Sequence, residues 1–173
     1  MATITFDLNG TLLDPGDQAE VLQRAVQLSM AHTLAGDFRP FAELLEAAGG
    51  QVPEAQPPFE DVTAGLDRLL AEGHRLAVIT NSARETGEQH LQRAGLLDRF
   101  DRVAGTDEIG AYKPDRRVYA LVPGDWHVAA HWWDILGARR AGRRTVYVAR
   151  REPLPATVAA DVVVERLDQL PAL

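Results

Sequence analysis

Residues 3–14 read TITFDLNGTLLD, and this stretch decides the fold. The run from Ala2 to Phe6 is short, apolar and β-branched, which predicts a strand that ends at Asp7. Gly10 follows as a turn residue. In α/β proteins, ligands bind at the carboxyl ends of parallel strands. Polar residues that follow the strands are therefore the first candidates for a functional site.

Strands and helices alternate through the second part of the chain. Strands are predicted over residues 75–80, 102–104, 126–130, 145–149 and 161–164, and helices over about 60–72, 84–94, 114–122 and 133–141. Such alternation is typical of βαβ units with right-handed crossovers. We therefore expect an α/β fold with one doubly wound parallel sheet.

The region after the first strand differs from this pattern. Apolar residues recur at helical spacing over about 18–33 and 40–48, and the Pro-rich connector VPEAQPP follows at residues 52–58. We interpret this region as an insertion. The expected division is a core domain of residues 1–13 and 58–173 with a small helical cap of residues 14–57.

The composition excludes several classes of protein. The 173 residues are 46% hydrophobic, carry a formal net charge of -7 and include no cysteine. An acidic chain without a basic run argues against nucleic acid or a membrane as partner, and disulfides are excluded. The N-terminus does not resemble a signal peptide, and no apolar run reaches the roughly 18 residues that a membrane span needs. We expect a cytoplasmic protein.

The strand ends collect several reactive side chains, namely Asp7, Thr11, Thr80, Asn81, Lys113, His131 and Asp134. Each alone has an ordinary structural explanation, such as a turn former, a helix cap or a surface lysine. Together at one sheet edge they fit a nucleophilic carboxylate, a lysine that balances its charge and donors that hold an anion. We expect the side chains of Asp7 and Lys113 to approach within ~3–4 Å.

These residues stand in four ordered motifs that resemble the haloacid dehalogenase superfamily. The motifs are FDLNGTLLD at 6–14, VITNS at 78–82, YKPDRRVY at 112–119 and VAAHWWD at 128–134. The resemblance covers nearly the whole chain. It implies a haloacid dehalogenase-like Rossmannoid core in which Asp7 is the nucleophile.

Two departures separate this chain from the phosphatase branch of that superfamily. Asn9 stands where those phosphatases have a second Asp, and an amide cannot serve as general acid and base. Ala129 and Ala130 stand where they have a Gly-Asp pair that ligates Mg²⁺, a metal that prefers hard oxygen ligands. The pattern instead resembles type II 2-haloacid dehalogenases, which work without a metal. The resemblance therefore implies no cofactor, with Mg²⁺ needed only if the chain is a phosphatase.

The resemblance also implies roles in an SN2 displacement of halide from a 2-haloalkanoate. Asp7 attacks the α-carbon, and water then hydrolyses the aspartyl ester. Lys113 neutralises Asp7, while Asp134 and Tyr119 order Lys113 and the water. The other implied roles are in substrate or halide binding and fall on Thr11, Thr80, Asn81 and His131, with Arg24 as the cap arginine and Arg39 in reserve.

Alternatives remain open at this stage. One is a phosphatase that has kept the fold, and another is a member that has lost catalysis, which the short cap favours. His131 stands where many relatives have Asn and is able to act as a donor or as a base. The expected partner is a small anionic molecule, and the resemblance implies that two copies can form a homodimer.

Overall fold

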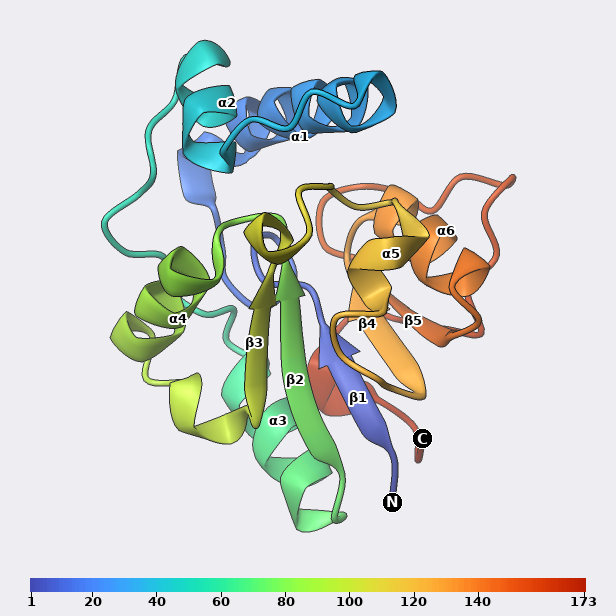
Figure 1. The fold of residues 1–173 in the computed structure, drawn as a ribbon. Coiled ribbons are helices and arrows are strands. Elements are labelled where there is room, and N and C mark those ends of the chain that lie inside the picture. The colour runs from blue at the N-terminus through green and yellow to red at the C-terminus, as the bar shows by residue number, and fades with distance from the viewer.

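Six parallel strands form a single sheet in the computed structural model, which describes residues 1–173. The strands are β1 (Thr3–Phe6), β2 (Arg75–Thr80), β3 (Arg102–Gly105), β4 (Trp126–Ala129), β5 (Arg144–Val148) and β6 (Val162–Val164), in the order β3-β2-β1-β4-β5-β6 (Figure 1). The order reverses at β1, which pairs with β2 on one side and β4 on the other. The predicted doubly wound α/β fold is confirmed.

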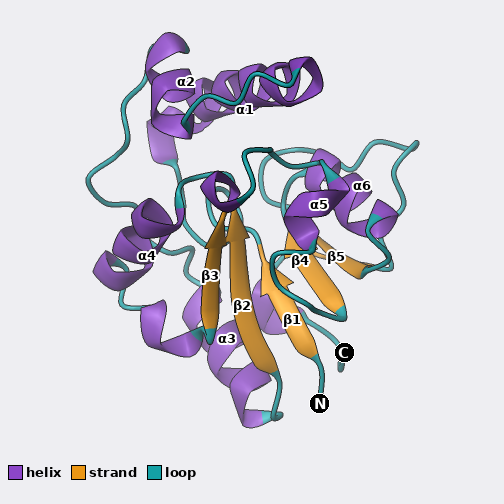
Figure 2. Ribbon diagram, viewed as in Figure 1, coloured by secondary structure: helices purple, strands orange, loops and turns teal.

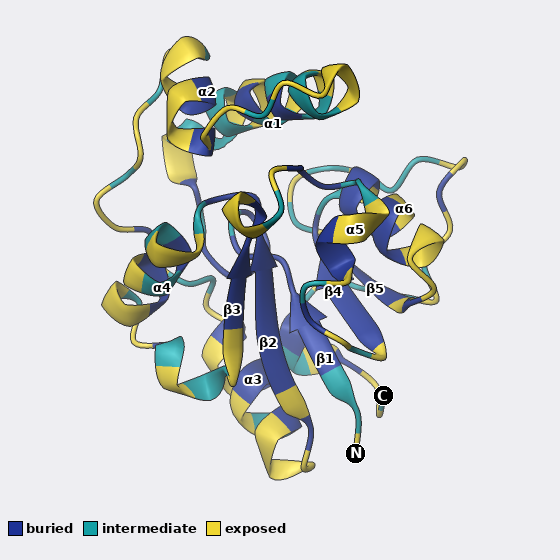
Figure 3. Ribbon diagram, in the orientation of Figure 1, coloured by how far each residue is buried: buried dark blue, intermediate teal, exposed yellow.

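Helices cover both faces of the sheet because successive strand residues point to opposite sides. On β2, Leu76 and Val78 belong to a core cluster shared with α3 (Val62–Ala71) and α4 (Arg84–Arg93). Ala77 and Ile79 belong to a second cluster, shared with α5 (Arg116–Tyr119) and α6 (Trp132–Arg140). The strands are therefore buried over most of their length (Figure 3).

A pair of helices, α1 (Ala19–Ala35) and α2 (Phe41–Ala47), lies beyond the carboxyl ends of the strands (Figures 1 and 2). The chain leaves the core and returns at one point, where the amide of Asp14 donates to the carbonyl of Pro57 at 2.8 Å. The two helices share a small apolar cluster with Tyr112 of the core. None of the helices in the structure has the length and apolar character to cross a bilayer.

One predicted helix is wrong in extent. The expected helix over 114–122 is observed only as α5, while the ends of the other predicted elements shift by one or two residues. Asp115 caps the start of α5 by accepting from the amide of Arg117 at 2.9 Å. The guanidinium of Arg143 donates to the carbonyls of Tyr119 and Val122 at its other end. The helix cannot continue because Pro123 has no N–H to donate to the carbonyl of Tyr119, and Arg143, which is distant in sequence, donates to that carbonyl instead.

Candidate active site

Asp7 lies at the end of β1 and is held by its own loop. The hydroxyl of Thr11 donates to Asp7 Oδ2 at 2.8 Å and accepts from the amide of Ala130 at 2.9 Å. The turn between them requires Gly10, whose φ is +83° and whose added Cβ would lie 2.7 Å from His131 Nε2. The loop therefore fixes one carboxylate oxygen of Asp7 at the sheet edge.

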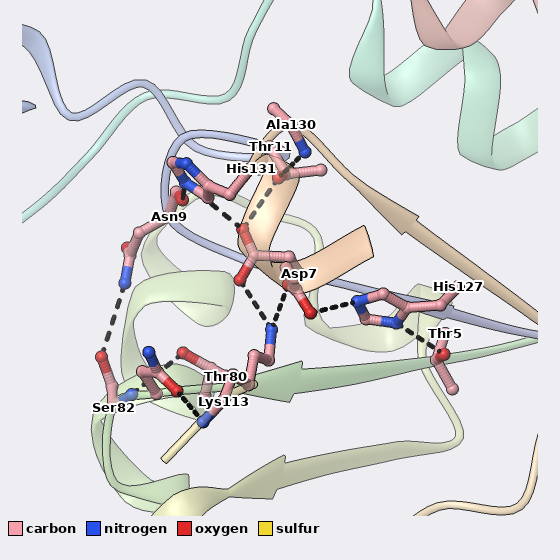
Figure 4. A network of polar contacts seen from close by, with 12 residues as sticks. Thr5, Asp7, Asn9, Thr11, Thr80, Ser82, Lys113, His127, Ala130 and His131 are labelled. Carbon is pink, nitrogen blue, oxygen red and sulfur yellow. Dashed lines mark hydrogen bonds and ion pairs between the residues drawn. The ribbon is translucent and has the colours of Figure 1, made fainter. Parts of the chain in front are cut away.

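Lys113 supplies the charge opposite Asp7. Its Nζ lies 2.9 Å from Asp7 Oδ1, in agreement with the approach expected from the sequence (Figure 4). The same Nζ lies 2.7 Å from Asp134 Oδ2. Lys113 is the single lysine of the chain and is fully buried. Burial by itself lowers the pKa of Lys113, but the two carboxylates outweigh it and leave the pKa above its ordinary value. Lys113 therefore stays charged.

Asp134 is the second carboxylate, and it lies in the first turn of α6. Its Oδ1 accepts from the hydroxyl of Tyr119 at 2.6 Å and lies 3.0 Å from His127 Nε2. Burial by itself raises the pKa of Asp134, but His127 and Lys113 hold it well below the ordinary value. Burial and the neighbouring Asp134 raise the pKa of Tyr119, so its hydroxyl stays a donor.

The end of β2 contributes polar groups to the same place. The side-chain oxygen of Asn81 accepts from the amide of Lys113 at 3.1 Å, which sets the orientation of the amide group. Its Nδ2 is buried and has no protein partner. Thr80 accepts from the amide of Ser82 at 3.1 Å, and Asn9 Nδ2 lies 3.4 Å from Ser82 Oγ. Asn81 therefore offers an unused donor at the strand end.

His131 lies on the opposite side of Asp7. Its ring stacks on Trp133 with the centroids 5.0 Å apart. Its Nε2 lies 3.0 Å from the carbonyl oxygen of Asn9 and 3.8 Å from Asp7 Oδ2, while Nδ1 lies 3.5 Å from Glu152 Oε1. Burial lowers the pKa of His131, but Glu152, Asp7 and the Asn9 carbonyl together raise it to about 9. The ring is therefore a cation at neutral pH.

A cavity of about 290 Å³ opens over Asp7, between the sheet edge and α1. The predicted residues that line it are Asp7, Thr80, Asn81 and His131. Lys113 and Asp134 lie beneath, fully buried. Thr11 and Tyr119 are also buried outside the lining, so the structure places them behind Asp7 and Asp134 and not against a substrate.

The predicted cap arginines do not reach this cavity. Ala19, Glu20, Leu22, Gln23 and Val26 of α1 line it, and together they make up one face of the helix. Arg24 is one residue, about 100° of rotation, beyond Gln23 and is exposed. Arg39 is exposed and lies 3.5 Å from Asp37. The helical pattern of α1 could not say which face meets the cavity.

Sequence reasoning missed two sets of residues. Arg150, Arg151 and Glu152 line the cavity and follow β5, so the same strand-end rule would have found them. Arg150 is committed to Asp61 at 2.8 Å, and Arg151 to Asp14 at 2.7 Å. His127 lies within β4, and no motif or spacing distinguished it from the core residues beside it.

The residues present do not form a magnesium site. No group of three or more acidic, histidine or cysteine side chains is arranged to hold a metal ion. Ala129 and Ala130 carry no oxygen ligand, and both oxygens of Asp134 are already occupied by donors. The donor set around Asp7 thus differs from the one that Mg²⁺ requires.

Comparison with known proteins gives a consistent assignment. A model of the family described as haloacid dehalogenase-like hydrolase matches residues 23–148. An (S)-2-haloacid dehalogenase of Pseudomonas sp. (strain YL) is 33% identical over 101 residues, which are 54% of this chain and 44% of that enzyme. The (S)-2-haloacid dehalogenase H-109 of Pseudomonas putida is 28% identical over 192 positions, covering 86% of this chain and 85% of that enzyme. The second alignment is longer than the 173 residues of this chain, so that enzyme contains residues that this chain lacks.

Other relatives extend the comparison. A phosphoserine phosphatase of Thermus thermophilus is 31% identical, over 67% of this chain and 56% of that enzyme. The structure of L-2-haloacid dehalogenase from Xanthobacter autotrophicus superposes with a TM-score of 0.82 at 21% identity, covering 96% of this chain and 95% of the other. At that identity the superposition shows a shared fold.

Proposed function

This chain belongs to the haloacid dehalogenase-like hydrolase family, and from that premise we propose that it removes halide from small 2-haloalkanoates by hydrolysis. One observation carries the proposal. The carboxylate of Asp7 faces a cavity and is held by Lys113 and Thr11. Two residues further on, the chain has Asn9, whose amide cannot relay a proton. Displacement of halide at carbon needs a carboxylate nucleophile but no acid for the leaving group, because halide departs as an anion.

In the first step an oxygen of Asp7 attacks the α-carbon. A carbon–oxygen bond forms, the carbon–halogen bond breaks, and halide leaves with the bonding electron pair. Lys113 and the Thr11 hydroxyl hold the carboxylate in one orientation. A fixed orientation raises the rate because attack requires the oxygen, the carbon and the halogen to lie in line.

In the second step water attacks the ester carbonyl carbon of Asp7. The negative charge that develops on the carbonyl oxygen lies beside Lys113, which stabilises it. The bond between the ester oxygen and the carbonyl carbon of Asp7 breaks, so that oxygen leaves as the hydroxyl of the 2-hydroxy acid, which keeps one proton of the water while the other is released. Asp7 is again a carboxylate, with one oxygen now derived from water, and the proposed reaction needs no cofactor.

The substrate carboxylate needs donors in the cavity. Asn81 Nδ2 is unpartnered, Thr80 also lines the cavity, and His131 on the cavity wall is a cation. We assign His131 the role of a fixed positive charge on the cavity wall that attracts the substrate carboxylate, because a group whose pKa is raised to about 9 holds its proton at neutral pH. Its Nε2 carries a hydrogen, since the facing Asn9 carbonyl only accepts.

Residues 14–57 act as a cap in this proposal. Leu22, Gln23 and Val26 of α1 form the roof of the cavity, and Arg151 lies at its edge. The mostly apolar roof keeps water from the carboxylate until halide has left. We assign the halide-binding role to Arg151 in place of Arg24, because Arg151 lines the cavity and pairs with Asp14 through Nη2 alone, which leaves its other guanidinium nitrogens for an anion.

A phosphatase is the second candidate, and the similarity to a phosphoserine phosphatase favours it. One assay separates the two. Halide release from 2-chloropropionate and fluoroacetate is measured in EDTA with the wild type and Asp7→Asn. Release by the wild type alone supports the proposal. Cleavage of p-nitrophenyl phosphate that requires Mg²⁺, without halide release, refutes it in favour of the phosphatase.

A single turnover in H₂¹⁸O tests the covalent step. Hydrolysis at the ester carbonyl places the label first in the Asp7 carboxylate, which a mass measurement of the peptide around Asp7 detects. Label found in the 2-hydroxy acid alone would mean that water attacks the α-carbon directly, and Asp7 would then not be a nucleophile. The absence of both halide release and p-nitrophenyl phosphate cleavage would favour a narrower substrate or a chain that has lost its chemistry.

A further inference from the structure

His127 is a fully buried histidine in β4 that lies outside the cavity lining. It pairs in register with Thr5 of β1, so the two side chains lie on the same side of the sheet. Its ring lies between two polar groups. Nδ1 lies 2.9 Å from Thr5 Oγ1 (Figure 4), and Nε2 lies 3.0 Å from Asp134 Oδ1. A buried polar ring in this position needs an explanation beyond packing.

The Asp134 contact determines which ring nitrogen carries hydrogen. Asp134 is ionised, so both of its oxygens only accept hydrogen bonds. Oδ1 already accepts from the Tyr119 hydroxyl at 2.6 Å. A bare ring nitrogen 3.0 Å from the same oxygen would face it lone pair to lone pair. The Nε2 of His127 therefore carries a hydrogen and donates it to Asp134.

The Nδ1 side of the His127 ring is also fixed by its neighbours. Thr5 Oγ1 accepts from Arg143 Nη1 at 2.8 Å, and the other arm of Arg143 donates to the carbonyls of Tyr119 and Val122. The Tyr119 ring meets the His127 ring edge to face, with the centroids 5.3 Å apart. The imidazole therefore cannot rotate away from Asp134 without breaking contacts on both sides.

We propose that His127 is a positioning residue for the reaction proposed above, acting through Asp134. Its Nε2–H holds Oδ1, and Oδ2 of Asp134 therefore points at Lys113, 2.7 Å away. Lys113 in turn lies 2.9 Å from Asp7. The inference rests on the proposed function and adds to it a residue that touches neither substrate nor nucleophile. Without this donor, Tyr119 alone would orient Oδ1, and the carboxylate could turn away from Lys113.

Three substitutions separate the two ends of the ring. His127→Gln can place an amide donor near the position of Nε2, facing Asp134. His127→Asn is shorter and can place its donor only near the position of Nδ1, facing Thr5. His127→Leu places a donor at neither. If His127 has a purely structural role, the activity of all three variants should fall in proportion to their loss of stability. If His127 positions Asp134, only the Gln variant should keep an activity close to that of the wild type.

The measurement is the steady-state rate of halide release from 2-chloropropionate, with urea unfolding of each variant in parallel. We expect His127→Leu and His127→Asn to lose on the order of 10- to 100-fold in kcat, as for a lost hydrogen bond to a charged group, with KM within about twofold. His127→Gln should stay within about threefold of wild type. Equal kcat for the Gln and Leu variants, both folded, would overturn the inference.

A matched control is available in the same chain. His90 is also buried, and its Nε2 bonds to the carbonyl of Pro53 at 3.0 Å, away from the cavity. We expect His90→Leu to lower stability without lowering kcat. A fall in kcat as large as that of His127→Leu would mean that any buried histidine has this effect, and the inference would fail.

The failure of this inference can be told from the failure of the proposed function. A wild type that releases no halide refutes the proposed function. The inference has a readout that needs no activity, which is the ¹⁵N–¹H spectrum of the imidazole at pH 7.5. A slowly exchanging hydrogen on Nε2 of His127 supports the contact with Asp134. An Nε2 without hydrogen overturns the inference, whatever the activity.

Discussion

Replacing Lys113 by Met tests the charge balance on which the site depends. The substitution keeps an unbranched side chain of similar length but leaves Asp7 and Asp134 without their shared cation. Removing one partner of a buried ion pair costs about 3–5 kcal/mol of unfolding free energy, because an uncompensated buried charge remains. Against a typical total of ~5–15 kcal/mol, the variant should fold but be clearly weakened.

The stability difference between the wild type and Lys113→Met should depend on pH. In the wild type the pKa of Asp134 lies below its ordinary value of 3.8, so its stabilising contribution is present above that value and is lost as pH falls. Without Lys113 the pKa of a buried carboxylate rises. The free-energy cost of its unpaired charge is greatest at neutral pH and becomes smaller as the carboxylate takes up a proton. The stability difference between wild type and Lys113→Met should therefore narrow from pH 7.5 to pH 5.

Urea unfolding followed by tryptophan fluorescence measures the difference at both pH values. The double variant Asp7→Asn/Lys113→Met should regain about 1–2 kcal/mol, because one of the two unpaired charges is gone. Halide release by the single variant should fall by about 100-fold or more, since Lys113 stabilises the developing negative charge. A stability loss below about 1 kcal/mol, or a difference that widens at pH 5, would refute the reasoning.

Other predictions address the cavity and its support. Arg24→Ala should leave kcat/KM for 2-chloropropionate within about twofold, because Arg24 lies outside the cavity, whereas Asn81→Ala should raise KM about tenfold or more through loss of a donor to a charged group; equal effects would contradict the assignment. The kcat/KM of the wild type should fall as pH rises through about 9, where His131 loses its proton, and His131→Asn should lack this decline. A rise through the same range would identify His131 as a base. Gly137→Ala would place a Cβ 2.5 Å from the Tyr119 hydroxyl, so we expect a loss of about 1–3 kcal/mol in urea unfolding together with slower halide release. An unchanged unfolding midpoint would show that the site accommodates the methyl group.

Much of the candidate site was predictable because strand ends are local features. Asp7 directly follows β1 and Asn81 directly follows β2, and a parallel sheet brings such residues to one edge. Lys113 lies in the loop before α5 and was predicted as the residue that opens a helix. Arg151 and Glu152 obey the same rule after β5 but lie in no motif, so they were overlooked. The rule therefore locates the site well, but it does not rank the residues in it.

The misplaced cap arginine has a different cause. Periodicity predicts that α1 is a helix with an apolar stripe, but it does not set the rotation of the helix against the rest of the molecule. Leu22, Gln23 and Val26 face the cavity because α1 packs on α2 and on Tyr112, contacts that lie far apart in sequence. A rotation by one residue would have exchanged Gln23 and Arg24.

The sequence by itself determined the alternation of strands and helices, the parallel sheet and the set of strand-end residues, because hydrophobic period and turn chemistry act over a few neighbouring positions. Tertiary structure alone decided which side chains meet. Arg143 donates to the carbonyls of Tyr119 and Val122 at the end of α5, and His127 in β4 points one ring nitrogen at Asp134 in α6. No short-range sequence pattern predicts these contacts. Because they are buried, where the dielectric constant is low, their hydrogen bonds are stronger than they would be in water.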